Sequence, residues 1–354
     1  MLSFVPMVYA EKGSLNSPLR HRWVTKLKKE KLITLRPFQF TVPAIGENHI
    51  YVGAASGYFY ALNKKTGHKD WTAKLATAVY AEPVFDDAAV YVADRKGTIY
   101  ALNKTDGKVL WQFDTGAEIS SRPLLTADAI YVTTMTRQLI AIDREGRGRK
   151  WLVAQPGQSS QMTIKGSSSP VLYNGNIYVG YSDGTIVCHR TSDGSIVWSK
   201  PLTNRAARFT DVDSTPLIVN NVLYVSTLDD KTYALNPANG DMIWVANGGG
   251  PNDITPDAGR LYVAGNGRVV ALDINTGKPL WEQDLKEPEL STPALKDGVL
   301  VVFSTKDKMY MLDANTGAVK FSRFLGKGTF GRPIIEDDVL YVLTNSSSLF
   351  SFKW

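Results

Sequence analysis

The sequence predicts an all-β fold, an eight-bladed β-propeller built from four-stranded antiparallel blades. Three repeated features predict it: an apolar strand motif, an aromatic residue that closes each unit, and a proline that opens it. The first unit shows their order, with apolar residues 50–53, a polar gap, alternating residues 60–63, a turn at 66–67 and then Trp71. Apolar runs separated by turns in this way describe a β-meander.

The apolar motif occurs eight times, at intervals of 40, 40, 47, 46, 38, 39 and 40 residues. Its central residues are Tyr51, Tyr91, Tyr131, Tyr178, Tyr224, Tyr262, Val301 and Tyr341. A repeat of about 40 residues with several short strands matches a propeller blade, whereas helical repeats of this length would show a 3.6-residue periodicity. Because stacked repeats form one body, we expect residues 11–354 to be a single propeller domain.

The closing aromatic residue follows only seven of the eight apolar motifs. These residues are Trp71, Trp111, Trp151, Trp198, Trp244, Trp281 and Phe321. The eighth blade therefore needs an outermost strand from elsewhere in the chain, and the segment around Trp23 can supply it. We expect this N-terminal strand to join the last blade and close the ring, so that no blade keeps a long open edge.

A proline stands eight residues before the central residue of the apolar motif in every unit except the sixth, which has Ile254. These prolines are Pro43, Pro83, Pro123, Pro170, Pro216, Pro293 and Pro333. Proline cannot donate a hydrogen bond to a sheet, so it belongs at a strand start or on an edge strand. We place it at the head of each innermost strand, facing the central channel.

The second half of each unit has a fixed spacing, in which Ala61, Gly67 and Trp71 occupy positions 1, 7 and 11. A small residue, a glycine that can adopt positive φ and a large flat ring indicate that the indole lies against backbone. Cys188 occupies the alanine position of its unit. We therefore interpret it as a small buried packing residue and not as a nucleophile.

Composition and charge exclude several classes of protein. Apolar residues make up 44% of the chain and charged residues 21%, which argues against disorder. The net charge of +6 is mild, and the basic runs at 26–31 and 144–150 lack interleaved aromatics that could stack on bases, so no nucleic acid is expected as a partner. The sequence has no apolar run of about 20 residues, so no transmembrane segment is predicted.

The first ten residues resemble the end of a secretory signal. An apolar run at 2–10 places Val8 and Ala10 three and one residues before Glu11, as at a signal-peptide cleavage site. We therefore interpret residues 1–10 as a signal-peptide remnant and expect the protein to be exported.

The repeat is stretched at three connections, and these predict a binding surface. Most units need 18 to 20 residues from the closing aromatic to the next central residue, but the link after Trp151 takes 27 and the link after Trp198 takes 26. The N-terminal link after Trp23 takes 28. All three lead from an outermost strand to the next innermost strand and emerge on one face, where long loops of repeat proteins commonly bind partners.

Two sets of residues in these links are candidates for that role. Met162 and Ile164 are apolar residues beside Lys165 in a polar segment; they suit a protein interface, or they tuck under the loop as a local plug. Asp211 and Asp213 alternate with a valine and should point the same way. They either cap the turn before Pro216, orient Arg208 or Lys165, or pair with a basic residue of a partner.

The spacing resembles the quinoprotein propeller repeat, in which the closing aromatic docks between neighbouring blades. The resemblance covers nearly the whole chain, from about Arg22 to Trp354. It implies a blade-docking role for Trp23, Trp71, Trp111, Trp151, Trp198, Trp244, Trp281 and Phe321. Two groups share this repeat, the quinone-dependent alcohol and sugar dehydrogenases and the BamB family, which belongs to the machinery that inserts β-barrels into the outer membrane.

Length and local sequence favour the BamB family. Residues 208–216 read Arg-Phe-Thr-Asp-Val-Asp-Ser-Thr-Pro and closely resemble the family's Arg-Leu-Ser-Asp-Val-Asp-Thr-Thr-Pro. Residues 162–166 match its Leu-Ser-Leu-Arg-Gly loop with conservative changes, although Lys165 cannot form the bidentate fork of the arginine it replaces. The dehydrogenases are considerably longer, and many carry adjacent cysteines, for which Cys188 alone is insufficient.

The resemblance implies a non-catalytic periplasmic scaffold of the β-barrel assembly (BAM) machinery, peripheral at the outer membrane, with no cofactor and no metal. It implies binding to the POTRA domains of BamA, with Met162, Ile164 and Lys165 as anchors and Arg208, Asp211 and Asp213 in support. Unfolded outer-membrane protein clients are a further implied partner. Family members are typically lipoproteins, but Ala10 and Glu11 stand where the lipid-bearing cysteine is expected, so this N-terminus does not support a lipid anchor.

Two other functions are alternatives to the BAM scaffold. One is a quinone-dependent dehydrogenase that uses the channel and needs Ca²⁺ bound by clustered oxygens; the other is a propeller adaptor for another envelope complex. The four histidines show no metal-ligand spacing, and neither a P-loop nor a nucleophile elbow is present. Glu82, Arg122 and Arg332 stand just before prolines; we interpret them as solvated channel lining, with binding of a small anion as the alternative.

Overall fold

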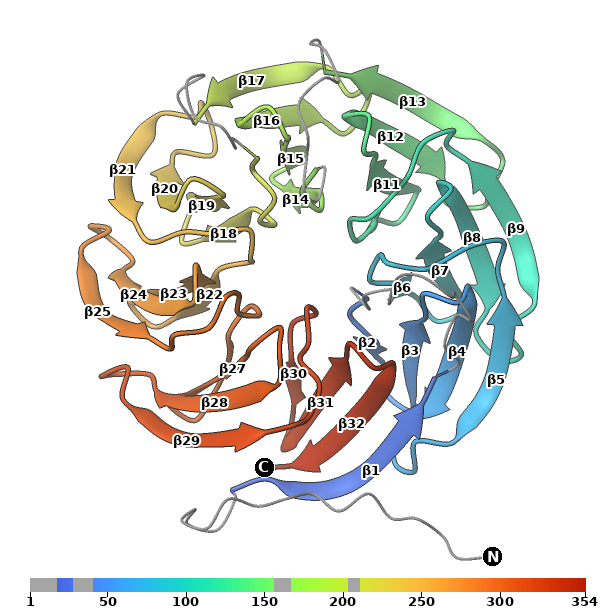
Figure 1. Cartoon of the computed structure of the whole chain (residues 1–354). Coiled ribbons are helices and arrows are strands. Elements are labelled where there is room, and N and C mark those ends of the chain that lie inside the picture. Colours follow the sequence, from blue (N-terminus) through green and yellow to red (C-terminus); the bar gives the residue numbers. More distant parts are fainter. Residues whose placement is uncertain (1–17, 28–40, 156–166, 203–210) are drawn as a thin grey trace, which may run out of the picture.

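The described residues of the computed structural model are 18–27, 41–155, 167–202 and 211–354. They form eight four-stranded antiparallel sheets arranged as blades around a central channel (Figure 1). The predicted eight-bladed β-propeller is therefore confirmed. Within this part of the chain, no helix has the length and apolar character needed to cross a membrane.

The first four blades each contain four consecutive strands, numbered from the channel outwards. Blade 1 contains β2 (Ala44–Ile45), β3 (His49–Gly53), β4 (Tyr58–Asn63) and β5 (Lys69–Lys74). Blade 2 contains β6 (Val84–Phe85), β7 (Ala89–Ala93), β8 (Thr98–Asn103) and β9 (Val109–Asp114). Blade 3 contains β10 (Leu124–Leu125), β11 (Ala129–Thr133), β12 (Gln138–Asp143) and β13 (Arg149–Ala154). Blade 4 contains β14 (Val171–Tyr173), β15 (Asn176–Gly180), β16 (Thr185–Arg190) and β17 (Ile196–Pro201).

The next three blades repeat this order, and the last one departs from it. Blade 5 contains β18 (Leu217–Val219), β19 (Val222–Thr227), β20 (Lys231–Leu235) and β21 (Met242–Asn247). Blade 6 contains β22 (Thr255–Asp257), β23 (Arg260–Gly265), β24 (Arg268–Asp273) and β25 (Pro279–Asp284). Blade 7 contains β26 (Ala294–Lys296), β27 (Val299–Phe303), β28 (Lys308–Asp313) and β29 (Val319–Phe324). Blade 8 combines β30 (Ile334–Glu336), β31 (Val339–Thr344) and β32 (Ser348–Lys353) with β1 (Arg20–Lys26).

The two middle strands of each blade carry the core. In blade 1 almost every residue of β3 and β4 is buried, because neighbouring blades cover both faces of the sheet. The outermost strands are more exposed, since only their third and fifth residues face inwards in β9, β17, β21, β25 and β29. The buried clusters join residues of adjacent blades. One of them contains Val90 of blade 2 and Val79 of the connection between blades 1 and 2, together with Tyr51 of blade 1. The core of this protein therefore lies between its blades.

Each tryptophan of an outermost strand lies on a glycine of the next blade. Trp281 of blade 6 covers Gly317, which lies in the turn between β28 and β29 of blade 7. Its Nε1 donates to the carbonyl of Ala314 in the same turn at 3.0 Å. The receiving glycines have φ between +69° and +77°, a conformation that glycine adopts without strain. The pairs are Trp23–Gly67, Trp71–Gly107, Trp111–Gly146, Trp151–Gly194, Trp198–Gly240, Trp244–Gly277 and Trp281–Gly317. Each of these seven tryptophans therefore contacts the blade that follows its own.

Phe321 is the exception among the closing aromatics. It packs against a cluster that contains Leu19 and Phe352, with Trp354 beside it, and not on a glycine. The reason is topological, because β1 replaces the fourth strand of blade 8 and no turn joins it to β32. Blade 8 therefore offers neither the turn glycine nor the turn carbonyl that an indole would use.

The N-terminal strand closes the ring, as predicted. β1 lies beside β32 in Figure 1 and pairs with it antiparallel, with Trp23 opposite Ser351. A register shift between His21 and Trp23 reproduces the shift that the other blades show at the same place, such as the one between Ala61 and Leu62. β1 is thus equivalent to the outermost strands of the other blades in register as well as in position.

The prolines stand where the sequence placed them. Each of the seven immediately precedes an innermost strand, and all of them line the channel together with Ile254 of blade 6. The innermost strands have only two or three residues, so their unpaired edges leave little room for a further strand.

We predict that replacing Gly317 by alanine destabilises the ring far more than replacing Gly175. Both glycines have a φ of +74°, so a side chain strains the backbone equally, by about 1–2 kcal/mol. A Cβ on Gly317 would lie 2.5 Å from Cε3 of Trp281, whereas one on Gly175 meets no described atom within 4 Å. Overpacking should add about 1–3 kcal/mol for Gly317→Ala alone. Chemical denaturation of both variants measures the difference, and equal losses would contradict the docking contact.

We predict that removing residues 18–30 destabilises the whole ring and not one end of it. A chain that begins at residue 31 loses Trp23, and loss of a buried tryptophan side chain alone costs about 3–5 kcal/mol. Compared with a chain that begins at residue 18, it should unfold in one transition at a clearly lower temperature, which calorimetry measures. Unchanged melting would show that β1 does not close the ring.

Candidate functional site

The loop face is the face on which every outermost strand leads to the next innermost strand. The four strands of a blade alternate in direction, so all these connections emerge on the same side of the ring. The two long links after β13 and β17 lie there, in adjacent blades 4 and 5. Of the predicted partner-binding residues, Met162, Ile164, Lys165 and Arg208 lie outside the described residues, and their roles stay predictions.

Asp211 and Asp213 are in the described part of the second link, and both are buried, with exposed fractions of 3% and 8%. Val212 between them packs on Gly180 of blade 4, and its N–H donates to the carbonyl of Tyr181 at 3.2 Å. Each aspartate is engaged in interactions within the molecule. Burial of both side chains favours a positioning role for them over direct pairing with a partner.

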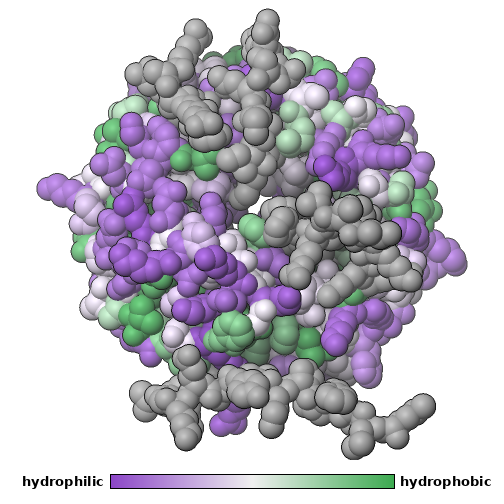
Figure 2. Space-filling view, in the orientation of Figure 1, coloured by the Kyte–Doolittle hydropathy of each residue, from purple (hydrophilic) through white to green (hydrophobic). Residues whose placement is uncertain are grey.

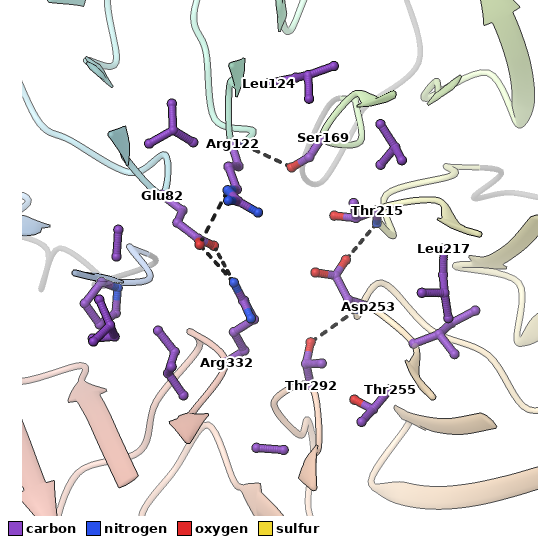
Figure 3. A pocket seen from close by; sticks show the side chains of 18 of the residues that line it. Glu82, Arg122, Leu124, Ser169, Thr215, Leu217, Asp253, Thr255, Thr292 and Arg332 are labelled. Carbon is purple, nitrogen blue, oxygen red and sulfur yellow. Dashed lines mark hydrogen bonds and ion pairs between the residues drawn. The ribbon is translucent and has the colours of Figure 1, made fainter. Parts of the chain in front are cut away.

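A belt of eight residues lines the channel at the residue before each proline position. We call this set the channel belt: Val42, Glu82, Arg122, Ser169, Thr215, Asp253, Thr292 and Arg332. Figure 3 shows most of it, with side chains pointing towards one another across the channel. Each member comes from a different blade, so the repeat itself brings the eight positions together.

One half of the channel belt is held by charge. Glu82 lies between two arginines: Nη2 of Arg332 donates to its two oxygens at 2.9 and 3.0 Å, and Nε of Arg122 lies 3.6 Å away (Figure 3). Arg332 belongs to blade 8 and Glu82 to the connection that enters blade 2, so this ion pair spans blade 1, whose belt residue is Val42. Burial alone would lower the pKa of Arg332, but attraction to Glu82 and Asp253 raises it above its usual value.

The other half of the belt is held by hydrogen bonds that each involve a backbone N–H. Asp253 accepts a hydrogen bond from the backbone N–H of Thr215 at 2.7 Å, and its own N–H donates to Oγ1 of Thr292 at 3.2 Å. The backbone N–H of Arg122 donates to Oγ of Ser169 at 3.1 Å. Two arginines and two acids give the belt no net charge, which agrees with the interpretation as channel lining.

The channel belt separates two cavities. The channel cavity has a volume of about 1050 Å³ and is lined by the prolines and the innermost strands. The loop-face cavity has a volume of about 540 Å³ and adds Tyr80, Arg95, Met135, Phe330 and Asp213 to the belt. Figure 2 shows hydrophilic residues gathered beside the central opening. Sequence reasoning missed Asp253 as a belt residue, because Ile254 replaces the proline that marks this position in the other blades.

The belt does not fit the quinone and Ca²⁺ that a dehydrogenase would need. Its two carboxylates are already engaged, Glu82 by arginines and Asp253 by a backbone N–H, and they come from different sides of the belt (Figure 3). Calcium requires a cluster of six to eight oxygen ligands. Within the described residues, no group of three or more His, Cys, Asp and Glu side chains could hold a metal ion.

Cys188 and His189 are structural. Cys188 is fully buried opposite Trp198, and burial raises the pKa of its thiol, which agrees with the predicted packing role. His189 is buried as well, with Nδ1 2.9 Å from the carbonyl of Gly194 and Nε2 3.2 Å from the hydroxyl of Tyr181. Burial lowers the pKa of His189, which favours its neutral form.

Comparison with known sequences gives one consistent result. A family model described as outer membrane protein assembly factor BamB matches residues 55–265 and 265–353. BamB of Yersinia pestis is 26% identical over 262 residues, which are 72% of this chain and 56% of that protein. BamB of Escherichia coli K12 is 32% identical over 148 residues, which are 40% of this chain and 38% of that protein. The match thus spans about half the length of the first relative and less of the second.

Solved structures share the fold. The crystal structure of BamB from Moraxella catarrhalis has a TM-score of 0.82 at 17% identity and covers 95% of this chain and 100% of that one. Quinohemoprotein alcohol dehydrogenase from Comamonas testosteroni has a TM-score of 0.77 at 15% identity and covers 95% of this chain and 76% of that one. At these identities the likeness shows the propeller architecture alone.

We predict that Glu82→Gln lowers the free energy of unfolding by about 1–2 kcal/mol, because it leaves two arginines facing each other across the channel. Combining it with Arg332→Ala in a double-mutant cycle should recover part of that loss. Arg122→Ala should cost less than half as much, since Arg122 is farther from Glu82 and more exposed, at 53% against 36% for Arg332. Chemical denaturation measures the parent chain, the three single variants and the double variant, and an absent coupling between Glu82 and Arg332 would contradict this description of the belt.

Proposed function

The chain belongs to the family of the outer membrane protein assembly factor BamB, and on this premise we propose that it is a non-catalytic scaffold subunit of the β-barrel assembly machinery. The observation that carries the proposal is the family match, which extends over both halves of the ring. We place the protein in the periplasm, peripheral to the outer membrane. The named relatives in Yersinia pestis and Escherichia coli support this assignment.

The proposed mechanism is docking of the loop face on the POTRA region of BamA. Met162 and Ile164 supply apolar anchors and Lys165 supplies a cation, a combination that often carries much of the affinity of a protein interface. Arg208, Asp211 and Asp213 form the supporting set. The burial of Asp211 and Asp213 supports a role in fixing the base of the link after β17.

The ring contributes rigidity to this mechanism. Val212 is held between blades 4 and 5 by packing on Gly180, and the backbone N–H of Leu228 donates to the carbonyl of Asp211 at 3.1 Å. A link whose base is fixed in this way loses less conformational entropy on binding than a free segment would. The propeller thus presents short binding segments from a preorganised surface. In this role it would also stand near the client proteins that the machinery handles.

We predict that replacing Ile164 and Lys165 together by glutamate abolishes co-purification with BamA of the same organism. The change removes an apolar anchor and reverses one charge, and loss of central anchors typically costs 2 kcal/mol or more. Affinity purification of the tagged chain from envelope extract, followed by identification of bound proteins, measures the effect.

The matched control places the same two changes on the outer rim. Lys278→Glu with Leu280→Glu alters one cation immediately before β25 and one apolar residue on β25, and Leu280 is 49% exposed. This control should retain BamA, and both variants should melt like the parent chain. Binding that survives in the Ile164 and Lys165 variant would refute the anchors, and capture of a different envelope complex by the parent chain would favour an adaptor instead.

A further inference from the structure

A row of three side chains crosses the outer three strands of every blade. In blade 6, Tyr262 on β23 stands opposite Ala271 on β24, which stands opposite Trp281 on β25. The tyrosine hydroxyl and the indole N–H both donate to one carbonyl of the next blade, that of Ala314, at 3.1 and 3.0 Å. This shared acceptor ties blade 6 to blade 7 at two points.

The same double hydrogen bond occurs at two further junctions. Between blades 4 and 5, Tyr178 and Trp198 donate to the carbonyl of Pro237 at 3.0 and 2.9 Å. Between blades 5 and 6, Tyr224 and Trp244 donate to the carbonyl of Ile274 at 3.1 and 3.3 Å. Ile274 and Ala314 directly follow the third strand of their blades, and Pro237 lies two residues after the end of β20. All three stand at the start of the turn that carries the receiving glycine.

The junction between blade 8 and blade 1, which we call the seam, lacks these hydrogen bonds. Its row is Tyr341, Ser351 and Trp23 on β31, β32 and β1. The Tyr341 hydroxyl, Ser351 Oγ and Trp23 Nε1 are all buried, and within the described part of the chain none of the three has a hydrogen-bond partner. Lys64 follows β4 at the place where the other junctions provide the acceptor carbonyl.

A cavity of about 370 Å³ opens at the seam beside this row. Tyr341, Lys64, Arg22 and Glu336 line it. Arg22 is near enough to oppose the rise in pKa that burial causes for Tyr341, without meeting the geometry of a hydrogen bond. Buried polar groups without partners weaken a contact more than apolar groups of the same shape would.

Apolar packing and a small number of polar contacts hold the seam, and Trp23 and Leu27 share one buried cluster with Ile50, Val52 and Leu62 of blade 1. Trp23 covers Gly67, Oγ1 of Thr25 donates to the carbonyl of Gly67 at 2.6 Å, and Lys64 forms an ion pair with Glu336 at 2.5 Å. In addition, no turn joins β1 to β32, whereas each other outermost strand follows its neighbour in the chain through a short turn. β1 can therefore leave its blade without breaking a local connection.

We propose that β1 is a strap that releases before the rest of the propeller unfolds, so that the ring opens at the seam while the junctions among blades 4 to 7 stay closed. In the open state Trp23 leaves Gly67, and β32 presents an unpaired edge with Ser351 uncovered. Two hydrogen bonds that the seam lacks, each worth roughly fivefold in an opening equilibrium, make this opening at least about tenfold more frequent than opening at blades 4 to 7.

Thiol labelling tests the proposal within one molecule. Cys188 occupies the small-residue position of the row in blade 4, opposite Trp198, and Ser351 occupies the same position in blade 8, opposite Trp23. Both are fully buried, and Cys188 is the chain's single cysteine. Ser351→Cys therefore adds a thiol at the seam in a nearly isosteric change that removes a hydroxyl without a partner.

The full-length variant is incubated with iodoacetamide under native conditions, and mass spectrometry follows each thiol separately. We expect the introduced thiol to react about tenfold faster or more than Cys188, with the melting temperature unchanged. Ala271→Cys, at the same position of blade 6, is the matched control and should react as slowly as Cys188. Equal rates at Ser351→Cys and Cys188, whether slow or fast, would overturn the proposal.

A second pair of variants tests whether the missing hydrogen bonds are the reason that the seam opens more often. Tyr262→Phe removes a hydroxyl that bonds to the next blade, and should reduce the folding equilibrium constant about fivefold. Tyr341→Phe removes a hydroxyl without a partner at equal burial, and should leave stability and seam labelling unchanged or improved. Equal destabilisation by the two changes would show that the seam is as tightly bonded as the other junctions.

Discussion

The contact between a tryptophan and a glycine of the next blade is the interaction on which this ring depends. Its requirements explain the spacing of each unit: the indole needs a small residue beside it, such as Ala271, and a glycine at positive φ in front of it. The contact always joins two blades, and the buried clusters do the same. No blade completes its own core, so stability belongs to the closed ring, as in other repeat proteins whose units bury surface only against neighbours.

Closing a ring from one chain makes one blade unlike the others. Blade 8 takes its fourth strand from the N-terminal segment, and this strand reproduces the usual register shift and places Trp23 on Gly67. What it cannot reproduce is the turn to the third strand. For that reason Phe321 has no glycine to cover. At the seam, the buried polar atoms of Trp23, Ser351 and Tyr341 have no hydrogen-bond partner among the described residues, unlike the Tyr and Trp donors that join blades 4 to 7.

The parts of the repeat that hold the ring together are poor candidates for function. The aromatic, glycine and proline positions serve the framework, and the channel belt neutralises its own charges through Glu82 and Asp253. Variation in length is concentrated in the links after Trp151 and Trp198, which lead into the adjacent blades 4 and 5. The proposed scaffold role places partner binding in these links and leaves the ring as a rigid support, in keeping with the BamB family to which the chain belongs.

The sequence alone determined the number of blades, the closure by the N-terminal strand, the place of the prolines and the packing role of Cys188, because each follows from periodic spacing. It also located Glu82, Arg122 and Arg332 at the channel. Only the tertiary structure decided how these three pair, since Arg332 reaches Glu82 across an intervening blade and the two residues are 250 positions apart. The burial of Asp211 and Asp213, the belt position of Asp253 and the missing hydrogen bonds of the seam likewise depend on contacts between distant segments. A local sequence pattern specifies where a residue lies within its own blade. Which residues of different blades come within contact distance is decided by the packing of the whole ring.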